Sequence, residues 1–230
     1  MSARALLCLA VLLFASTAVA EEAPWKQYET KRGAVFEKRS VPGSSYEEFR
    51  ATLDVAQNPA QAMTIFWKVA TDITSTKELK KTLVREGPNE VLIYEQIALS
   101  MVSDRDYTIR IWREPVAADG TQVLRFQTAN DQGPALAKGY VRLDVVRGFW
   151  SATPLPNGKT RLVFITHSDP GGSIPAVFAR GAQRDRFQVD FWVVVDQLPP
   201  AEKPAPAPAP APVAPSPAPE PAKAAEPAAQ

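Results

Sequence analysis

Hydrophobic and polar side chains alternate along residues 46–55, where apolar Phe49, Ala51, Leu53 and Val55 are separated by charged or polar residues. That period of two is typical of a strand with one buried face. Runs of similar character, bounded by turn residues, predict further strands. They cover residues 35–39, 82–85, 90–99, 103–113, 121–128, 137–145, 147–153 and 160–167.

Two segments instead show helical spacing. Asn58 precedes Pro59, the usual combination of an N-cap and a first helical residue, and apolar residues then recur every three or four positions to about residue 71. A longer helix is predicted from about residue 174 to residue 198, with Phe187, Phe191 and Val194 on one side. The polar stretch 25–32 predicts a further short helix at the start of the domain.

The connections between the predicted strands are short and carry Gly-Pro, Asp-Gly and Asn-Gly turn signals. Short connections favour antiparallel neighbours, because a parallel crossover needs a dozen residues or more. The sequence therefore predicts an α+β domain with one long antiparallel sheet that curls, and a terminal helix laid across its concave face. Two interiors fit this arrangement: a hollow between helix and sheet, or a seam in which they fill each other's space.

The two ends of the chain differ from this domain. Residues 1–20 are typical of a cleaved secretory signal, with Arg4, a short apolar stretch and the small residues Ala18 and Ala20 before the cleavage point. The domain then spans residues 21–198. Cys8 is the only cysteine, so the mature chain has no disulfide, no thiol nucleophile and no thiolate metal site. We expect export across the inner membrane to the bacterial periplasm.

Residues 199–230 contain twelve of the 22 prolines, mostly in Pro-Ala alternation. Such a segment lacks the apolar content for a core and prefers extended polyproline II conformations. We expect a disordered spacer, or a reach towards a partner that the tail sequence does not identify. Without Arg4 the chain carries 25 basic and 25 acidic side chains, so no excess of positive charge favours nucleic acid. The arginines at 180, 184 and 186 are interpreted as a solvated helix face.

Glu95 is the most unusual side chain of the predicted sheet. It falls on the same strand face as Val91, Ile93 and Ile97. A buried carboxylate costs several kcal/mol unless it is paired, protonated or wetted. Glu95 is therefore either a polar anchor for a ligand or one partner of an internal salt bridge. The next strand opens with Arg105, which would pair with Glu95 or hold the start of the strand, and with Asp106, for which a structural role in a turn is expected.

Three stretches carry a resemblance to a known family. They are Tyr94-Glu95-Gln96, the strand opening Val102-Ser103-Asp104-Arg105-Asp106-Tyr107, and Asp169-Pro170-Gly171-Gly172-Ser173-Ile174-Pro175 before the last helix. In this order, and together with Trp25 and the turn at residues 41–44, they resemble bacterial members of the START family of lipid-binding domains. The likeness covers nearly all of residues 25–198.

The resemblance implies the helix-grip fold of the START-like superfamily, in which a curved antiparallel sheet wraps around a long C-terminal helix. It also implies a cavity between them for one sterol, phospholipid, ceramide or similar molecule, with loops near the helix opening and closing the entrance. The loop at residues 129–138 is a candidate gate. Transient contact with a membrane fits this picture, and no cofactor or metal is expected.

Strand and helix faces give the candidates for the cavity wall. They are Glu95, Arg105, Tyr107, Ile109, Ile111, Val141, Leu143, Phe187, Phe191 and Val194. Some sterol carriers of this family have a second arginine six positions after the motif arginine, where this chain has Ile111. That difference favours a more apolar pocket.

The preferred function is therefore non-catalytic binding, and transfer, of a lipid or similar hydrophobic molecule. One alternative is an enzyme of the same superfamily, of cyclase or hydrolase type, which would need acid–base groups in the pocket. His167, the only histidine, is expected to be structural, and no Ser-His-Asp set is apparent. Another alternative is an interaction module with a vestigial cavity.

Overall fold

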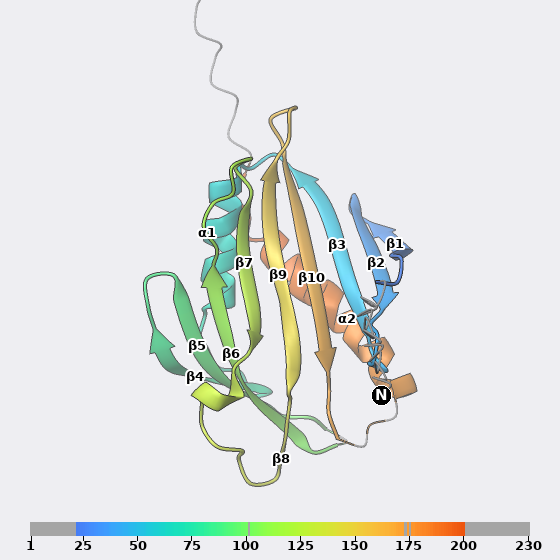
Figure 1. The fold of residues 1–230 in the computed structure, drawn as a ribbon, viewed down its shortest axis with the longest axis vertical. Coiled ribbons are helices and arrows are strands. Elements are labelled where there is room, and N and C mark those ends of the chain that lie inside the picture. The colour runs from blue at the N-terminus through green and yellow to red at the C-terminus, as the bar shows by residue number, and fades with distance from the viewer. Residues whose placement is uncertain (1–21, 101, 173, 175, 201–230) are drawn as a thin grey trace, which may run out of the picture.

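A large curved antiparallel sheet and a long helix that crosses one of its faces make up the domain (Figure 1). The computed structural model describes residues 22–100, 102–172, 174 and 176–200. The α+β fold class predicted from the sequence is confirmed. The predicted signal, residues 201–230 of the tail, and Ser173 and Pro175 of the loop before the last helix lie outside the described residues. Within the described residues, no helix is long and apolar enough to cross a bilayer.

The sheet has ten strands in the described part of the chain. They are β1 (Lys26–Lys31), β2 (Ala34–Ser40), β3 (Glu47–Val55), β4 (Leu79–Glu86), β5 (Glu90–Ile97), β6 (Asp104–Arg113), β7 (Gln122–Thr128), β8 (Tyr140–Arg142), β9 (Val145–Pro154) and β10 (Thr160–Asp169). The helices are α1 (Pro59–Ala70), the one-turn η1 (Asn130–Gln132) and α2 (Ala176–Val195). The spatial order of the strands is β1-β2-β3-β10-β9-β7-β6-β5-β4, with β8 beside β6.

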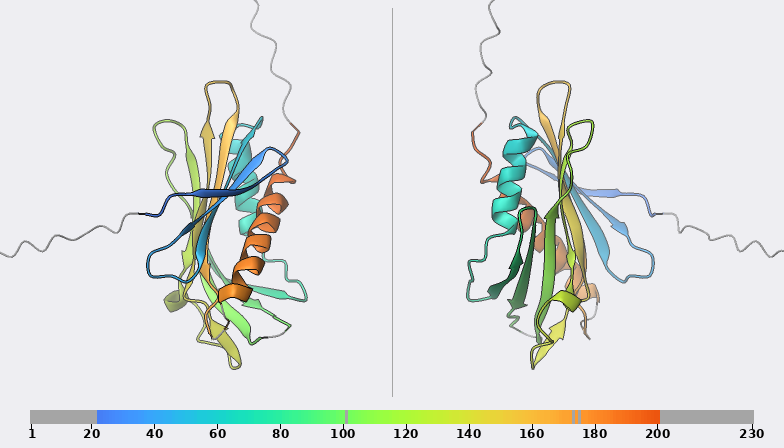
Figure 2. Two further views of the ribbon diagram at one scale, coloured as in Figure 1. Left: turned by 90° about the vertical axis from the view of Figure 1, so that its right-hand side faces the viewer. Right: turned by 60° about the vertical axis from the view of Figure 1, so that its left-hand side comes forward.

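Both long helices lie on the same side of the sheet, and α2 runs obliquely along it (Figure 2). Helix α1 begins where the sequence predicts: the Asn58 side chain accepts a hydrogen bond from the Gln61 amide at 2.9 Å, and the Gln61 side chain accepts one from the Asn58 amide at 3.0 Å. This reciprocal capping box satisfies two amides that the first helical turn leaves free.

The prediction of a helix at residues 25–32 is wrong, because this segment forms strand β1 and pairs with β2. Arg32 and Gly33 connect the two strands, with φ angles of 51° and 83°. Two consecutive residues with positive φ make the turn that matches the twist of a hairpin. Arg32 is held in this conformation by an ion pair with Asp196 at 2.5 Å and by its position 4.2 Å from the ring centre of Trp192.

The predicted strand at residues 137–145 is also largely wrong. Of this range, Tyr140–Arg142 form strand β8, which pairs with the start of β6 in parallel, and Val145 begins β9. The parallel pairing is possible because residues 129–139 make a long excursion between β7 and β8 rather than a tight turn.

Aromatic rings fill one half of the seam between α2 and the sheet. Trp150 of β9 stacks on Phe164 of β10 at 4.2 Å and on Phe191 of α2 at 5.6 Å between ring centres. Phe187 of α2 stacks on Phe164 at 5.0 Å, and Phe36 of β2 meets Phe191 edge-on at 5.5 Å. Such ring pairs contribute about 0.5–1.5 kcal/mol each beyond the area that they bury. Helix α2 is therefore fixed firmly against strands β2, β9 and β10.

Asp106 ties the outer face of β6, opposite the face that α2 covers, to the segment between β7 and β8. Its fully buried carboxylate accepts hydrogen bonds from Arg142 at 2.8 and 3.1 Å, from the Ala137 amide at 3.0 Å and from the Tyr94 hydroxyl at 2.7 Å. Burial opposes ionisation, but these hydrogen bonds outweigh it and lower the pKa of Asp106. These contacts agree with the structural role that the sequence predicts for Asp106.

Replacing Asp106 by Ala is expected to cost about 3–5 kcal/mol of unfolding free energy, because it leaves the Arg142 charge without its buried partner. Asp54 offers a matched control, since Arg161 binds it with the same two-point geometry, at 2.8 and 2.9 Å, on an exposed part of the sheet. Asp54→Ala should cost about 1 kcal/mol or less. Urea unfolding of both variants measures the difference, and equal losses would contradict it.

Candidate functional site

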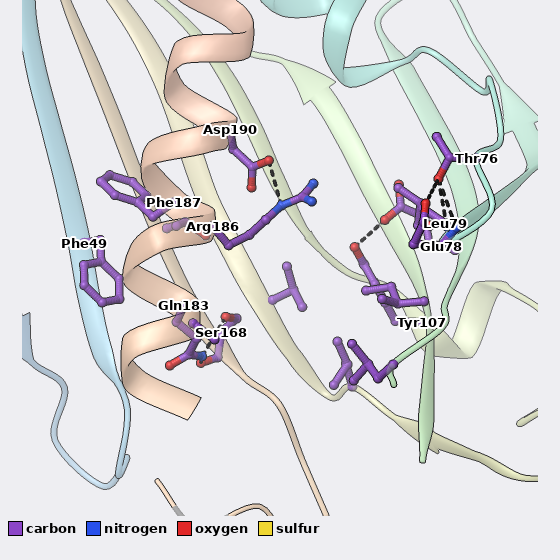
Figure 3. Close-up of a pocket in the computed structure, with 17 residues that line it drawn as sticks. Phe49, Thr76, Glu78, Leu79, Tyr107, Ser168, Gln183, Arg186, Phe187 and Asp190 are labelled. Atoms are coloured by element: carbon purple, nitrogen blue, oxygen red, sulfur yellow. Dashed lines mark hydrogen bonds and ion pairs between the residues drawn. The ribbon is translucent and has the colours of Figure 1, made fainter. Parts of the chain in front are cut away.

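A cavity of about 680 Å³ lies between α2 and the β4–β5–β6 wing of the sheet (Figure 3). Apolar side chains form most of its surface. The lining residues are Phe49, Thr76, Glu78, Leu79, Glu95, Ile97, Leu99, Tyr107, Leu143, Val146, Thr166, Ser168, Ala182, Gln183, Arg186, Phe187 and Asp190. Ligand pockets in proteins commonly have about 300–1,000 Å³ and a few polar groups in an apolar wall. The cavity falls within that range.

The cavity begins where the aromatic stack ends. Phe187 belongs to both, because it stacks on Phe164 and also faces the hollow. Beyond it, towards the start of α2, the side chains on the helix are smaller or polar, namely Ala182 and Gln183. Gln183 donates hydrogen bonds to the backbone oxygen and hydroxyl of Ser168 on β10, at 2.9 and 3.1 Å. The seam is thus packed at one end and open at the other.

On the sheet side, Glu95 is held by two neighbouring strands. It accepts a hydrogen bond from the Tyr107 hydroxyl on β6, and the Lys81 ammonium on β4 lies 3.7 Å from its other oxygen. Burial, followed by the charge of Glu95, raises the pKa of Tyr107 well above its ordinary value, so the phenol keeps its proton and stays a donor. Glu95 therefore has the internal partners that the salt-bridge interpretation expects, and it also lines the cavity; its role as an anchor for a ligand stays a prediction.

On the helix side, Arg186 and Asp190 form an ion pair one turn apart, with 2.9 Å between Nε and Oδ1. Their side chains are 68% and 41% accessible, yet desolvation raises the pKa of Asp190 against the opposing effect of Arg186. Figure 3 shows both side chains projecting from α2 towards the side on which Tyr107 lies.

Arg105 does not pair with Glu95. Its guanidinium donates to three backbone oxygens instead, those of Ser103, Pro170 at 3.0 Å and Gly171 at 3.2 Å. The side chain is 3% exposed, so these carbonyls take the place of water around its charge. Arg105 thereby ties the start of β6 to the loop that leads into α2.

This loop needs glycine for a specific reason. Gly171 and Gly172 have φ angles of 62° and 67°, and a Cβ on Gly171 would approach Val141 and the Arg142 oxygen to 3.3 Å. A side chain at this position would therefore be strained and crowded against β8. The two glycines thereby bring the loop before α2 against Val141 of β8 and Arg105 of β6.

The domain matches the sequence model of the START domain over residues 9–186. The chain belongs to the START family. A further relative is a protein from Pseudomonas aeruginosa described as uncharacterized protein PA1579, which is 29% identical over 177 residues, 75% of this chain and 85% of the relative.

Solved structures agree on the START fold. A STAR-related lipid transfer protein from Xanthomonas axonopodis superimposes with a TM-score of 0.63 at 23% identity, over 76% of this chain and 98% of the other. The lipid transfer and protein localization domain of human StarD13 gives a TM-score of 0.60 at 16% identity, over 77% and 90% of the two chains. The family and the fold together support a domain that binds a hydrophobic ligand.

The START cavity contains some of the wall candidates and not others. Glu95, Tyr107, Leu143 and Phe187 line it. The other six lie elsewhere: Ile109, Ile111, Phe191 and Val194 in the packed core, Arg105 at the loop before α2, and Val141 against the two glycines of that loop. Their strand and helix faces were assigned correctly, but a face alone does not separate a packed position from an open one. Contact of any of the ten with a ligand stays a prediction.

Arg186 and Asp190 were missed as residues that line the cavity; Arg186 is 68% exposed, in agreement with the solvated face expected for the arginines, and it also borders the hollow. The helical pattern contained a signal: Asp190 lies at the edge of the stripe that Phe187, Phe191 and Val194 form on α2. A carboxylate at the edge of an apolar stripe, with an arginine four residues earlier, indicates a paired group. The cavity residues of the 76–79 segment carried no such signal, because they lie where α1 leads into β4.

The candidate gate at residues 129–138 contributes no residue to the cavity lining. It is tied down on the outer side of the sheet, where the Asn130 side chain accepts from the Thr108 amide at 2.9 Å and donates to the Leu143 oxygen at 2.8 Å. Gly133 lies so close to Thr108 that a Cβ would come within 1.7 Å of the hydroxyl oxygen. The segments that border the hollow are instead residues 76–79 and Leu99.

His167 points away from the cavity. Its strand neighbours Thr166 and Ser168 line the hollow, so the alternation of β10 puts His167 on the other face. Its Nδ1 lies 3.3 Å from the Glu47 oxygen, which can only accept, so the neutral ring carries its proton there. Burial lowers the pKa of His167, and the Glu47 contact only partly opposes this effect.

The stability of the domain should fall as the pH drops through the histidine range. The folded-state pKa of His167 lies below the unfolded value of about 6.5, so the unfolded chain binds a proton that the folded chain rejects. One such group changes the unfolding free energy by at most about 1.4 kcal/mol per pH unit. Urea unfolding at about pH 7.5 and 5.5 should show a smaller loss for His167→Gln than for the wild type. Identical losses would contradict a buried neutral His167.

Proposed function

We propose that this START domain binds one lipid or similar hydrophobic molecule in the cavity and carries it between membranes without changing it chemically. The observation that carries the proposal is the hollow of about 680 Å³ between α2 and the β4–β6 wing. A domain without a ligand would gain stability by closing this space, because unfilled apolar volume is costly. The packed aromatic half shows that the same helix and sheet are able to meet closely.

Apolar contact between the cavity wall and a lipid supplies enough free energy for reversible binding. Burying roughly 500 Å² of lipid surface at about 25 cal/mol per Å² yields on the order of 12 kcal/mol before costs. Immobilising the molecule costs several kcal/mol of this gain. The remainder corresponds to reversible binding, which a carrier needs for release. Transfer is further supported by the Xanthomonas relative, which is described as a lipid transfer protein.

The partners of Glu95 and Asp190 and the orientation of His167 favour binding over catalysis. An enzyme of this scaffold would need an acid or base free to exchange a proton with its substrate. Glu95 lies against Lys81 and Tyr107, and Asp190 is paired with Arg186. His167 faces away from the hollow. These arrangements support a wall that recognises a ligand rather than one that reacts with it.

We infer that carriage takes place outside the cytoplasm, in the periplasm if the source is a bacterium with two membranes. Residues 1–20 support export, and the Pro-Ala tail from residue 199 supports a spacer that lets the domain reach across the compartment. Gln57 contacts the Pro199 oxygen at 2.5 Å, so the tail leaves the domain beside the start of α1.

Ala182→Trp should block ligand uptake, because Ala182 lines the cavity and an indole there fills part of the hollow. Val189→Trp is the matched control: it lies on the same helix, is 53% exposed and faces away from the cavity. Lipid extracted from both purified proteins and quantified by mass spectrometry is the measurement. We expect the amount bound per protein to fall about tenfold or more in Ala182→Trp, as for a loss of 1.4 kcal/mol or more.

Native mass spectrometry of the wild type completes the test. A single lipid-sized mass per chain, released on denaturation, agrees with the proposal. A wild-type protein that takes up no lipid from vesicles would refute it, as would equal lipid content in the two tryptophan variants.

A further inference from the structure

Six arginines in the described part of the chain lie over an aromatic ring, and five of them also bind a carboxylate. The paired five are Arg32 with Asp196, Arg39 with Glu48, Arg50 with Glu37, Arg110 with Glu90 and Arg125 with Glu114. Arg113 is the sixth: its guanidinium lies 4.3 Å from the ring centre of Trp67, and no acidic residue of the described ranges forms an ion pair with it. The indole thus holds Arg113 in place with its charge unmatched.

The Nε–H of Arg113 is a buried donor that has no acceptor among the described residues. Burial lowers the pKa of Arg113, whereas the hydrogen bond to Asp196 raises the pKa of Arg32. A guanidinium keeps its proton in either setting, so Arg113 remains a cation. A buried charged donor without an acceptor is destabilising, and an anion from outside the domain would relieve this cost.

Arg113 borders a hollow of about 490 Å³ between α1 and the hairpin of β6 and β7. Strand alternation places Arg113 on the inner face of the sheet, in line with Ile109 and Ile111 of the core. Helix α1 packs against β7 and β9 on this face (Figure 1). The lining of this hollow shares no residue with the lining of the START cavity, so the two are separate.

Amide and apolar side chains complete the wall of the hollow. The amides of Asn89 and Gln122 have no hydrogen-bond partner within the part of the chain that the structure describes, and each offers both a donor and an acceptor. Met63 and Val123 supply apolar surface, and Val116, which is 62% exposed, adds to it. A carboxylate fits the arginine fork, a peptide group fits the amides, and an aliphatic side chain fits the apolar wall.

The charge of the hollow favours a ligand with a single negative charge. Glu114 also lines it, but Arg125 matches this carboxylate at 2.5 Å, which leaves Arg113 as the uncompensated ion of the described lining. A phosphate monoester carries about −1.5 to −2 charges near neutral pH and would exceed this cation, whereas a carboxylate equals it. At about 30 Å³ for each non-hydrogen atom, the hollow holds about 16 of them, enough for one acylated amino acid.

We propose that this hollow is a second binding site, which takes the carboxylate end of an N-acylated amino acid. Arg113 binds the carboxylate, and the amides of Asn89 and Gln122 bind the acyl amide. The side chain of the ligand packs on Met63 and Val123. Two sources carry this chemistry: a free N-acyl amino acid and the C-terminal residue of a peptide chain.

N-acetyl-leucine and N-acetyl-leucinamide test the site, because they share one body and differ in charge. Each is titrated into the isotope-labelled protein, and NMR follows the Nε–H signal of Arg113, which is assigned by its absence in Arg113→Lys. N-acetyl-leucine should shift this signal with saturation and a Kd of about 5 mM or lower. The amide should bind at least about tenfold more weakly, because it offers no anion to the guanidinium.

Arg113→Gln should weaken the binding of N-acetyl-leucine about tenfold or more, with the indole N–H signal of Trp67 as the readout. Arg110→Gln is the matched control: Arg110 lies on the same strand and stacks on a tryptophan at 4.6 Å, but Glu90 already binds its guanidinium at 2.6 Å. In that variant Glu90 keeps its ion pair with Arg85. The affinity of Arg110→Gln should equal that of the wild type.

The exposed Val116 allows the charge requirement to be tested without changing Arg113. Val116→Glu places a negative charge at the hollow and should weaken binding about fivefold or more at low salt, because like charges repel. Val116→Gln has nearly the same shape without the charge and should bind as the wild type does. This pair of variants is decisive if Arg113→Gln does not fold.

A longer probe identifies the source of the ligand. If the source is a peptide chain end, the acetylated tripeptide alanyl-alanyl-leucine should bind at least about threefold more tightly than N-acetyl-leucine. If the source is a free N-acyl amino acid, the two affinities should be equal. Both results agree with the carboxylate site.

Three results would overturn the proposal. They are a Kd for N-acetyl-leucine above about 5 mM, equal affinities for N-acetyl-leucine and its amide, and equal affinities in Arg113→Gln and Arg110→Gln. If Arg113→Gln does not fold, equal affinities in Val116→Glu and Val116→Gln would overturn it instead. Lipid content of the START cavity, measured on the same protein, bears on the carrier function alone.

Discussion

Two adjacent residues at the start of β6 hold the architecture together. Because side chains alternate along a strand, Arg105 and Asp106 point to opposite faces. Arg105 binds the carbonyls of the loop that leads into α2, and Asp106 binds Arg142 and the excursion before β8. One point of the sheet thereby holds the loop before α2 on one face and the excursion before β8 on the other.

The cavity itself results from unequal packing along α2. Large rings from β2, β9 and β10 fill the seam near Phe191, whereas Ala182 and Gln183 leave space between the helix and the β4–β6 wing. The tightly packed half of the seam between α2 and the sheet contributes the folding stability that the open half does not supply. A helix held by aromatic contacts at one end is able to stand away from the sheet at the other without losing its place.

Two of the carboxylates that border the hollow have an opposite charge nearby: Glu95 lies near Lys81 and Asp190 near Arg186. Glu78 also borders the hollow and accepts a hydrogen bond from the Thr76 hydroxyl at 3.3 Å.

The sequence by itself determined the order of strands and helices after β1, the cap of α1, the inward face of Glu95 and the structural role of Asp106, because each depends on local periodicity or on neighbours along the chain. It misjudged β1, where the positive φ of Arg32 is stabilised by Trp192 and Asp196 from the other end of the domain. Only the tertiary structure decided that Ile109 is packed while Leu143 and Arg186 border a hollow. Periodicity assigns a residue to a face, but the distance between two faces is set by side chains remote in sequence.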